Sequence, residues 1–228
     1  MENSQKLREH LGYEFRDLKL LRNALTHSSS INETHQQYYD NNERLEFLGD
    51  AVLETVISER LYHLLPKEEE GRLTRLRASI VCEESLAEIG TALGVGEALI
   101  LGRGEEHSGG WKRNSMIADG VEAIIGAIYL DGGFYEAQGV VLRLFDSVIQ
   151  RALEGKLHSD YKTALQEKLQ VNGDVSIQYI LDGQEGPDHD KVFYTSVAVN
   201  GMILGSGSGR SKKEAEQNAA KAAMKDMR

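Results

Sequence analysis

Apolar residues recur at helical spacing through residues 4–150 of the chain. Amphipathic helices produce this spacing because successive turns present the same face to a core. Strand-like alternation of apolar and polar residues is not convincing in this part of the sequence. Residues such as Asp17, Pro66 and Gly94 mark expected helix ends. The predicted helices cover residues 18–26, about 40–64, 73–93, 115–130 and 134–153.

The pattern changes beyond residue 153. Three of the segments that follow either alternate apolar and polar residues or are continuously rich in strand-forming residues. Asn200-Gly201 is typical of a hairpin turn between the last two of these segments. The final segment is an alanine-rich helix with Ser211 as its expected N-cap. The predicted elements are a helix over 160–171, strands over 175–181, 193–199 and 202–207, and a helix over 211–227.

These elements divide the chain into two domains. Residues 4–133 form an all-α domain, with a further helix that extends to about residue 153. The polar residues 154–159 suit a flexible linker. Residues 160–228 form a second domain of the α+β class with the order α-β-β-β-α.

Carboxylates stand inside two of the apolar helices. Glu43, Glu46 and Asp50 have the spacing i, i+3 and i+7, which places them within one narrow stripe of a helix. Asp119 and Glu122 repeat the i, i+3 spacing in a second helix. A single acidic residue on a helix usually faces solvent. Several acidic residues on two helices that also bury apolar faces are typical of a set of metal ligands. Oxygen ligands of this kind suit a hard divalent cation, Mg²⁺ or Mn²⁺.

Glycines lie in the interiors of the same two helices. Gly49 and Gly126 each cost a helix about 1 kcal/mol relative to alanine. We interpret them as points where the acidic helices cross closely enough to share metal ions. Tolerated glycines with no such role are the alternative for either position alone.

Composition limits the class of protein. The chain has 228 residues, of which 40% are hydrophobic, so a sizeable core is expected. No apolar run reaches about 18 residues, so we expect no membrane span, and the first residues lack the apolar region of a secretory signal. The single cysteine, Cys82, excludes an intramolecular disulfide and favours a packing role. These features predict a cytoplasmic location.

The net charge of −10 argues against a nucleic-acid partner only at first sight. Residues 1–154 hold 16 Lys and Arg against 26 Asp and Glu, whereas residues 155–228 hold 10 of each. Within the latter, residues 210–228 carry six basic and three acidic residues. The acidity therefore belongs to the helical domain, and a local basic patch can still bind phosphates.

Four blocks of the sequence resemble a known family. The run Asn-Glu-Arg-Leu-Glu-Phe-Leu-Gly-Asp at 42–50 resembles the signature of ribonuclease III, the double-stranded-RNA endonuclease family. Segments 70–78 and 118–127 resemble the family's further acidic segments, and residues 160–228 resemble its double-stranded-RNA-binding domain. The order of the blocks is that of the bacterial enzyme.

The resemblance implies an activity and its partners. It implies an endoribonuclease that hydrolyses double-stranded RNA with Mg²⁺, for which Mn²⁺ can substitute, and leaves 5′-phosphate and 3′-hydroxyl ends. It implies a homodimer in which each subunit cuts one strand, and substrates among precursors of ribosomal and other structured RNAs, messenger and transfer RNAs included. A non-catalytic double-stranded-RNA-binding protein is the alternative, and the presence of the acid set argues against it.

The resemblance also assigns roles to residues of the helical domain. It marks Asp50 and Glu122 as catalytic, and we assign Glu46, Asp119 and Glu122 as metal ligands. Glu43 and Glu70 match further acidic positions, with a role in substrate positioning or subunit contact. Phe47 and its apolar neighbours are candidates for the dimer contact, with ordinary core as the alternative.

Contacts with RNA are expected from three regions of the second domain. Such domains read the shape of A-form RNA through its 2′-hydroxyls and phosphates. A helix N-terminus that carries lysines favours phosphate, although Lys212 and Lys213 alone would be an ordinary charged pair. The expected contacts are Thr163, Gln166 and Glu167 in the first helix, His189 in the loop after the first strand, and Arg210, Ser211, Lys212 and Lys213 at the last helix.

Other chemistries find less support. The chain has no Gly-x-x-x-x-Gly-Lys-Ser/Thr phosphate loop, and Gly205-x-Gly207-x-Gly209 lacks the βαβ unit of a dinucleotide site. The seven histidines show no zinc-ligand spacing. His27 stands beside Ser28 and Ser29 without the context of a catalytic triad, so we interpret it as a structural hydrogen-bonding residue.

Overall fold

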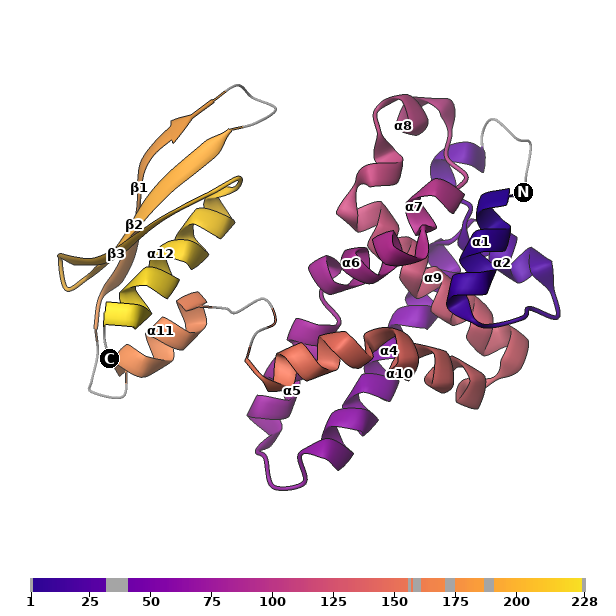
Figure 1. The fold of residues 1–228 in the computed structure, drawn as a ribbon, viewed down its shortest axis with the longest axis horizontal. Helices are drawn as coiled ribbons and strands as arrows, with labels where there is room; N and C mark the ends of the chain where they lie inside the picture. Colours follow the sequence, from indigo (N-terminus) through magenta and orange to yellow (C-terminus); the bar gives the residue numbers. More distant parts are fainter. Residues whose placement is uncertain are drawn as a thin grey trace. The chain divides into compact units, whose positions relative to one another are not determined.

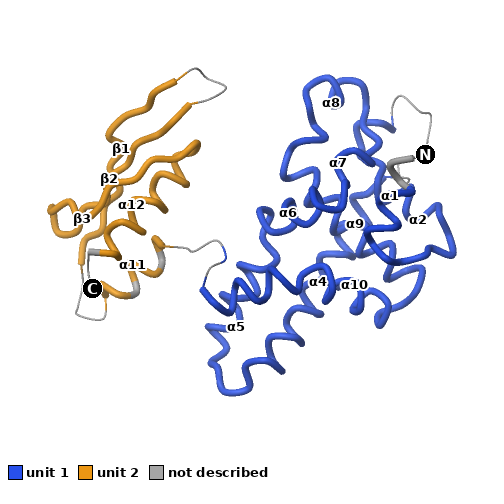
Figure 2. The backbone as a smooth tube through the Cα atoms, viewed as in Figure 1, with its two compact units in different colours: residues 1–157 blue, residues 158–228 orange. Residues whose placement is uncertain are grey.

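The computed structural model describes residues 2–31, 41–155, 157, 161–170, 175–186 and 191–226. The chain forms two compact units, Met1–Leu157 and His158–Arg228, each with its own hydrophobic core (Figure 2). Helices come first, followed by a helix, three strands and a final helix, which confirms the predicted fold class. In the part of the chain that the structure describes, no helix is long and apolar enough to cross a membrane.

The first unit is helical (Figure 1). Short 3₁₀ turns, η1 and η3, connect some of its helices. The elements are α1 (Glu2–Leu11), α2 (Leu18–Ala24), η1 (Ser28–Ser30), α4 (Glu43–Leu64), α5 (Glu70–Ile80), α6 (Glu83–Leu93), α7 (Val95–Ala98), α8 (Arg103–His107), η3 (Gly110–Lys112), α9 (Asn114–Gly132) and α10 (Phe134–Leu153).

Helix α9 lies inside this unit. It packs against α2, α4, α6 and α10, and Ile124, Ile125 and Ile128 are almost completely buried. A helix that is apolar on most sides has to be surrounded by others. Its acidic residues, Asp119 and Glu122, are therefore held on a rigid internal element.

Helices α4 and α9 cross at two glycines. A Cβ atom built on Gly49 would lie 1.8 Å from the carbonyl oxygen of Glu122. A Cβ atom on Gly126 would lie 2.2 Å from the carbonyl oxygen of Leu45. No side chain fits at either position without moving a backbone, so the prediction that these glycines mark the crossing is confirmed.

The prediction of one helix over residues 73–93 is wrong. The segment holds two helices, α5 and α6, and α5 already begins at Glu70. Between them Cys82 is extended, with φ −76° and ψ 159°, and precedes the acidic first turn of α6. The thiol of Cys82 donates to the carbonyl oxygen of Ser79 at 3.3 Å. Apolar periodicity continues across the break because both helices face the same core.

Helix α2 ends before the predicted residue 26. Leu25 and His27 leave the helix and pair through their backbones with Ile100, at 2.7 and 3.0 Å. Thr26, between them, accepts a hydrogen bond from the backbone of Asn42 at 2.8 Å. This extended segment therefore ties the start of α4 to the residues after α7.

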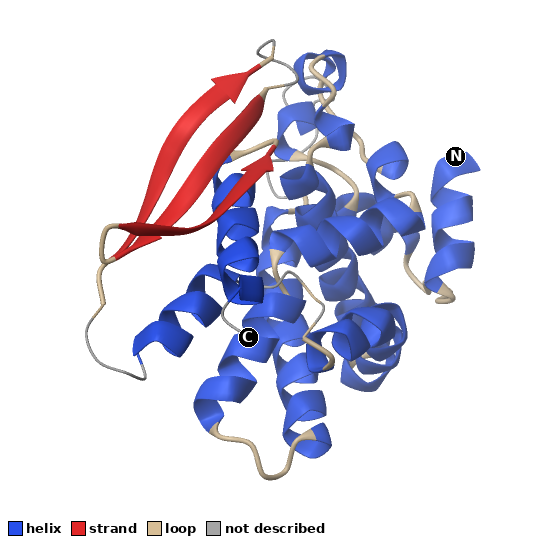
Figure 3. Cartoon of the chain, turned by 60° about the vertical axis from the view of Figure 1, so that its left-hand side comes forward, coloured by secondary structure: helices blue, strands red, loops and turns tan. Residues whose placement is uncertain are grey.

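The second unit is a three-stranded antiparallel sheet in the order β1-β2-β3 with two helices (Figures 1 and 3). Asn200 and Gly201 both have positive φ, 50° and 82°, as the predicted hairpin turn requires. β1 and β3 extend beyond their predicted C-terminal ends, β1 begins two residues later than predicted, and β2 begins one residue earlier. The elements are α11 (Tyr161–Gln170), β1 (Ile177–Glu185), β2 (Val192–Val199), β3 (Met202–Gly209) and α12 (Lys212–Asp226).

Glycines and alanines allow α12 to lie directly on β3. A Cβ atom on Gly205 or Gly207 would come within 2.5 Å or 2.3 Å of the α12 backbone. On the facing helix Ala219 and Ala223 are fully buried beside Leu165 of α11. The alanine-rich composition of α12 therefore reflects close packing on the sheet.

Candidate active site

The N-terminus of α4 is fixed by backbone hydrogen bonds. The carbonyl oxygen of Asn42 accepts from the amides of Leu45 and Glu46 at 2.9 and 2.8 Å. The side chain of Asn41 accepts from the amide of Glu43 at 3.3 Å. Carboxylates in the first turn interact favourably with the helix dipole. The acids at the start of α4 therefore have a defined position.

The three predicted metal ligands meet where α4 crosses α9. Each of Glu46, Asp119 and Glu122 offers a carboxylate oxygen, and these three oxygens lie within 4.8 Å of one another. All three residues are half-buried. The close approach at Gly49 and Gly126 makes this convergence possible, because helices separated by side chains would hold the carboxylates farther apart.

The environment of these acids favours the protonated forms. Burial, followed by the charges of Asp50, Glu46 and Asp119, raises the pKa of Glu122 to about 8. Burial raises the pKa of Glu46, with the charges of Asp119, Glu43 and Asp50 as further causes. Like charges that are held together and partly desolvated repel one another. A divalent cation would relieve this repulsion, and the all-oxygen donor set fits such an ion.

Asp119 has two neighbours that sequence reasoning did not place in the site. Burial raises its pKa, His27 lowers it, and Glu83 at the start of α6 raises it. Neither neighbour shares a helix with the predicted acids, so no spacing rule could have found them. The short Thr-His-Ser segment between two helices was the available signal for His27.

Among the described residues, the other predicted acids stand outside this group of three. Asp50 follows Glu46 by one turn and stands outside the group of three, but its charge is the largest that raises the pKa of Glu122. Glu43 begins α4, and its charge raises the pKa of Glu46. Glu70 begins α5, accepts from the hydroxyl of Thr74 at 2.8 Å, and lines a separate cavity.

That cavity lies between α4 and α5 and has a volume of about 440 Å³. Tyr62 and Arg77 are among its walls. Phe47, on the same helix as Tyr62, is 80% exposed, so the alternative that it is ordinary core is wrong. The residues that line the cavity are Ser58, Glu59, Leu61, Tyr62, Glu70, Leu73, Thr74 and Arg77.

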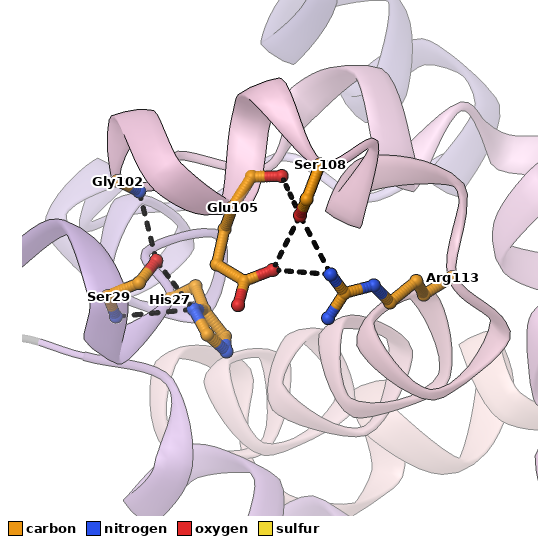
Figure 4. Close-up of polar contacts among 6 residues, drawn as sticks. All are labelled: His27, Ser29, Gly102, Glu105, Ser108 and Arg113. Atoms are coloured by element: carbon orange, nitrogen blue, oxygen red, sulfur yellow. Dashed lines mark hydrogen bonds and ion pairs between the residues drawn. The ribbon is translucent and has the colours of Figure 1, made fainter.

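Polar contacts tie the residues before α9 and the His27 segment in place (Figure 4). Arg113 forms an ion pair with Glu105 at 3.0 Å and donates to the hydroxyl of Ser108 at 2.7 Å. The ammonium of Lys112 lies 4.5 Å from the centre of the Trp111 ring. Lys112 and Arg113 therefore both have partners within the chain.

The predicted RNA contacts lie in the second unit. Gln166 is exposed on α11, and Arg210, Lys212 and Lys213 are exposed at the start of α12. Ser211 caps α12, since its hydroxyl accepts from the amide of Glu214 at 3.1 Å. Thr163 and Glu167 belong to α11, but their side chains lie outside the described part of the chain, as does His189.

Comparisons with known proteins agree with this arrangement. A family model described as Ribonuclease-III-like matches residues 17–148, and one described as a double-stranded RNA binding motif matches residues 161–227. Ribonuclease 3 of Pelotomaculum thermopropionicum is 50% identical over 96% of this chain and 90% of its own. The chain belongs to the ribonuclease III family.

Further relatives support the assignment to this family. Ribonuclease 3 of Geobacillus thermodenitrificans is 47% identical over 98% of this chain and 91% of its own. The solved nuclease domain of the Campylobacter jejuni ribonuclease III is 45% identical, with a TM-score of 0.59, over 65% of this chain and 97% of that domain. The protein is an endoribonuclease of double-stranded RNA, and the family depends on a divalent metal ion. The alternative of a non-catalytic binder is not favoured.

Proposed function

We propose that the group Glu46, Asp119 and Glu122 binds Mg²⁺, for which Mn²⁺ can substitute, and that cleavage takes place there. The observation that carries this proposal is the convergence of three half-buried carboxylates within 4.8 Å. Their raised pKa values reflect the cost of holding them together without a cation. Mg²⁺ is the cation that retains waters and binds phosphates through a few carboxylates.

The chain's own residues prepare the hydrolysis. When bound, Mg²⁺ supplies an activated water and neutralises charge on the phosphodiester. Glu46, Asp119 and Glu122 would hold the ion through their carboxylate oxygens. Asp50, whose charge acts on Glu122, would reach the ion through a water or orient the nucleophile. The proposed products carry 5′-phosphate and 3′-hydroxyl ends.

We infer that the enzyme acts as a homodimer through α4 and α5. Phe47 is an exposed aromatic side chain. The cavity between α4 and α5, whose wall includes Tyr62, is large enough to receive an aromatic side chain, and Tyr62 itself is 67% exposed. A projecting side chain and a cavity on one molecule suit a two-fold interface, in which the Phe47 side chain of each subunit enters the cavity of the other. A solved nuclease domain of the Campylobacter jejuni ribonuclease III is described as structurally flexible in a region involved in dimer formation. Glu70, in the cavity wall, would then lie at the subunit contact.

Sedimentation of the full chain tests the dimer. We expect a dimer at micromolar concentration, and a monomer for Phe47→Ala, because truncation leaves the cavity of the partner unfilled. Tyr135→Ala is the matched control, since Tyr135 is equally exposed on α10. A wild-type monomer, or a dimer that survives Phe47→Ala unchanged, would contradict this interface.

The second unit holds the duplex in this proposal. Gln166, with Thr163 and Glu167, meets 2′-hydroxyls, and His189 reaches a second minor groove. Lys212, at the start of α12, binds phosphate with the helix dipole. The remaining proposed contacts are Arg210, Ser211 and Lys213. Precursors of ribosomal RNA and other structured RNAs in the cytoplasm are the proposed substrates.

Incubation with a long RNA duplex tests the activity. We expect fragments with 5′-phosphate and 3′-hydroxyl ends in Mg²⁺, and intact duplex in EDTA. A gel shift without cleavage in Mg²⁺ and in Mn²⁺ would contradict the proposal.

A further inference from the structure

A second cavity is formed by residues of α7, α8 and η3 and by the segment that follows α7. Its volume is about 470 Å³, which lies within the range of small-molecule binding sites. It shares no residue with the cavity between α4 and α5 or with the acidic group at the crossing of α4 and α9. The side chains that line it are Glu97, Leu99, Ile100, Leu101, Glu106 and Trp111.

Backbone contacts fix the walls of this cavity. A Cβ atom on Gly96 would lie 2.3 Å from the carbonyl oxygen of Trp111, so η3 packs directly on α7. The amide of Ile100 donates to the carbonyl oxygen of Leu25 at 2.7 Å, and the carbonyl oxygen of Ile100 accepts from the amide of His27 at 3.0 Å. The cavity therefore has its shape before any ligand binds.

Apolar side chains form most of its lining. Leu99, Leu101 and Trp111 are half-buried, and Ile100 is 37% exposed. Trp111 also presents a π surface to cations, because the ammonium of Lys112 already lies 4.5 Å from the centre of its ring. The lining therefore suits a ligand with an apolar body and a positive charge.

The charged groups of the lining are carboxylates. Glu97 and Glu106 line the cavity, and no lysine, arginine or histidine is among the described residues that do so. Glu106 is exposed, and its side chain has no partner among the hydrogen bonds and ion pairs of the described part of the chain. Like charges repel, so these two carboxylates disfavour an anion and favour a cation.

We propose that this cavity binds an aliphatic diamine or polyamine. Its methylene groups lie along the leucine and isoleucine side chains, and its ammonium groups meet Glu97 and Glu106, as alkylammonium side chains do at protein surfaces. Double-stranded nucleic acid carries a condensed atmosphere of counterions. Organic polycations in that atmosphere would reach the enzyme together with its substrate. The site is independent of the proposed metal site.

Trp111 makes the proposal directly testable, because it is the only tryptophan of the chain and lines the cavity. Full-length protein without RNA is titrated with spermidine at constant ionic strength, and tryptophan fluorescence is followed. We expect a saturable change, and about fivefold weaker binding by Glu106→Gln, which removes one charge of an exposed ion pair. Glu69→Gln is the matched control and should bind as the wild type does, because Glu69 is exposed and does not line the cavity.

Diamines of different length separate this site from attraction by charge alone. 1,3-Diaminopropane and 1,6-diaminohexane carry the same two charges, but the second has three more methylene groups. We expect the longer diamine to bind more tightly, by up to about fourfold for each methylene that the apolar wall covers. Isothermal calorimetry on the same proteins measures these affinities independently of fluorescence.

Three results would overturn the inference. The first is wild-type protein in which neither method detects saturable binding of spermidine. The second is an equal affinity in wild type, Glu106→Gln and Glu69→Gln, or an equal loss in the two variants. The third is binding of the shorter diamine as tightly as the longer one, because the apolar wall would then contribute nothing.

Discussion

Replacement of Gly49 by alanine perturbs the point where the two acidic helices cross. The added Cβ atom would lie 1.8 Å from the carbonyl oxygen of Glu122 and 2.9 Å from the amide nitrogen of Gly126. Both neighbours are backbone atoms of α9, so no side chain can turn away. The helices would have to separate by on the order of 1 Å to restore ordinary contact.

The magnitude follows from two opposing effects. Alanine in place of glycine favours a helix by about 1 kcal/mol. Overpacking a rigid interior costs about 1–3 kcal/mol. We expect the cost for Gly49→Ala to lie at or above the upper end of this range, because the atoms that the new Cβ meets belong to the backbone and cannot turn away. We expect a net loss of about 2 kcal/mol or more in the free energy of unfolding, together with weaker Mn²⁺ binding, because the three carboxylates move apart.

Urea denaturation and Mn²⁺ titration measure both effects. Gly139→Ala is the matched control: Gly139 lies within α10, and a Cβ atom there would meet nothing within 4 Å. This control should be stabilised by up to about 1 kcal/mol and should keep full metal affinity. If Gly49→Ala gains stability as Gly139→Ala does, or binds Mn²⁺ as the wild type does, the explanation of the crossing is wrong.

Three further predictions concern pH and RNA binding. Because the pKa of Glu122 is raised to about 8, protons compete with the metal ion below that pH, so Mn²⁺ affinity measured by calorimetry should rise toward pH 8 and then level off. A flat profile from pH 6 to pH 8 would contradict this coupling. The fold raises the pKa of Tyr13 from 10.0 to about 12, by burial and the hydrogen bond to Asp131, so its contribution to stability is full below pH 10.0 and is lost as pH rises through about 12. Wild type should therefore lose more stability than Tyr13→Phe over that interval, and equal losses would refute the assignment. Lys212→Ala combined with Lys213→Ala should raise KM strongly with kcat nearly unchanged, and should lower the log–log salt slope of binding by about one per phosphate contact; an unaltered KM at moderate salt would show that the second unit does not hold the substrate.

The sequence was sufficient for features that depend on local spacing. The carboxylate spacing in α4 and α9 brought Glu46, Asp119 and Glu122 to one side of their helices, and interior glycines located the crossing of these helices. The Asn-Gly pair identified the hairpin turn, since both of its residues need positive φ. Each of these signals depends on one residue's neighbours along the chain.

Features that depend on tertiary contacts could not be read in the same way. The break at Cys82 was missed because α5 and α6 bury faces of matching periodicity. His27 reaches the site through pairing with Ile100, which is distant in sequence. Phe47 stands beside buried Leu45 in an apolar helix, and only the packing shows that its side chain faces outward.

Glu122→Gln tests the central claim most directly. Glutamine keeps the size of the side chain but removes the charge from the carboxylate with the most strongly raised pKa. Single-turnover cleavage of a long RNA duplex in Mg²⁺ should fall to background. Duplex affinity in EDTA should stay at the wild-type value, because the double-stranded RNA binding motif lies in the second unit, at residues 161–227. Cleavage by Glu122→Gln at the wild-type rate would contradict the claim that the carboxylates at the crossing of α4 and α9 form the metal-dependent active site.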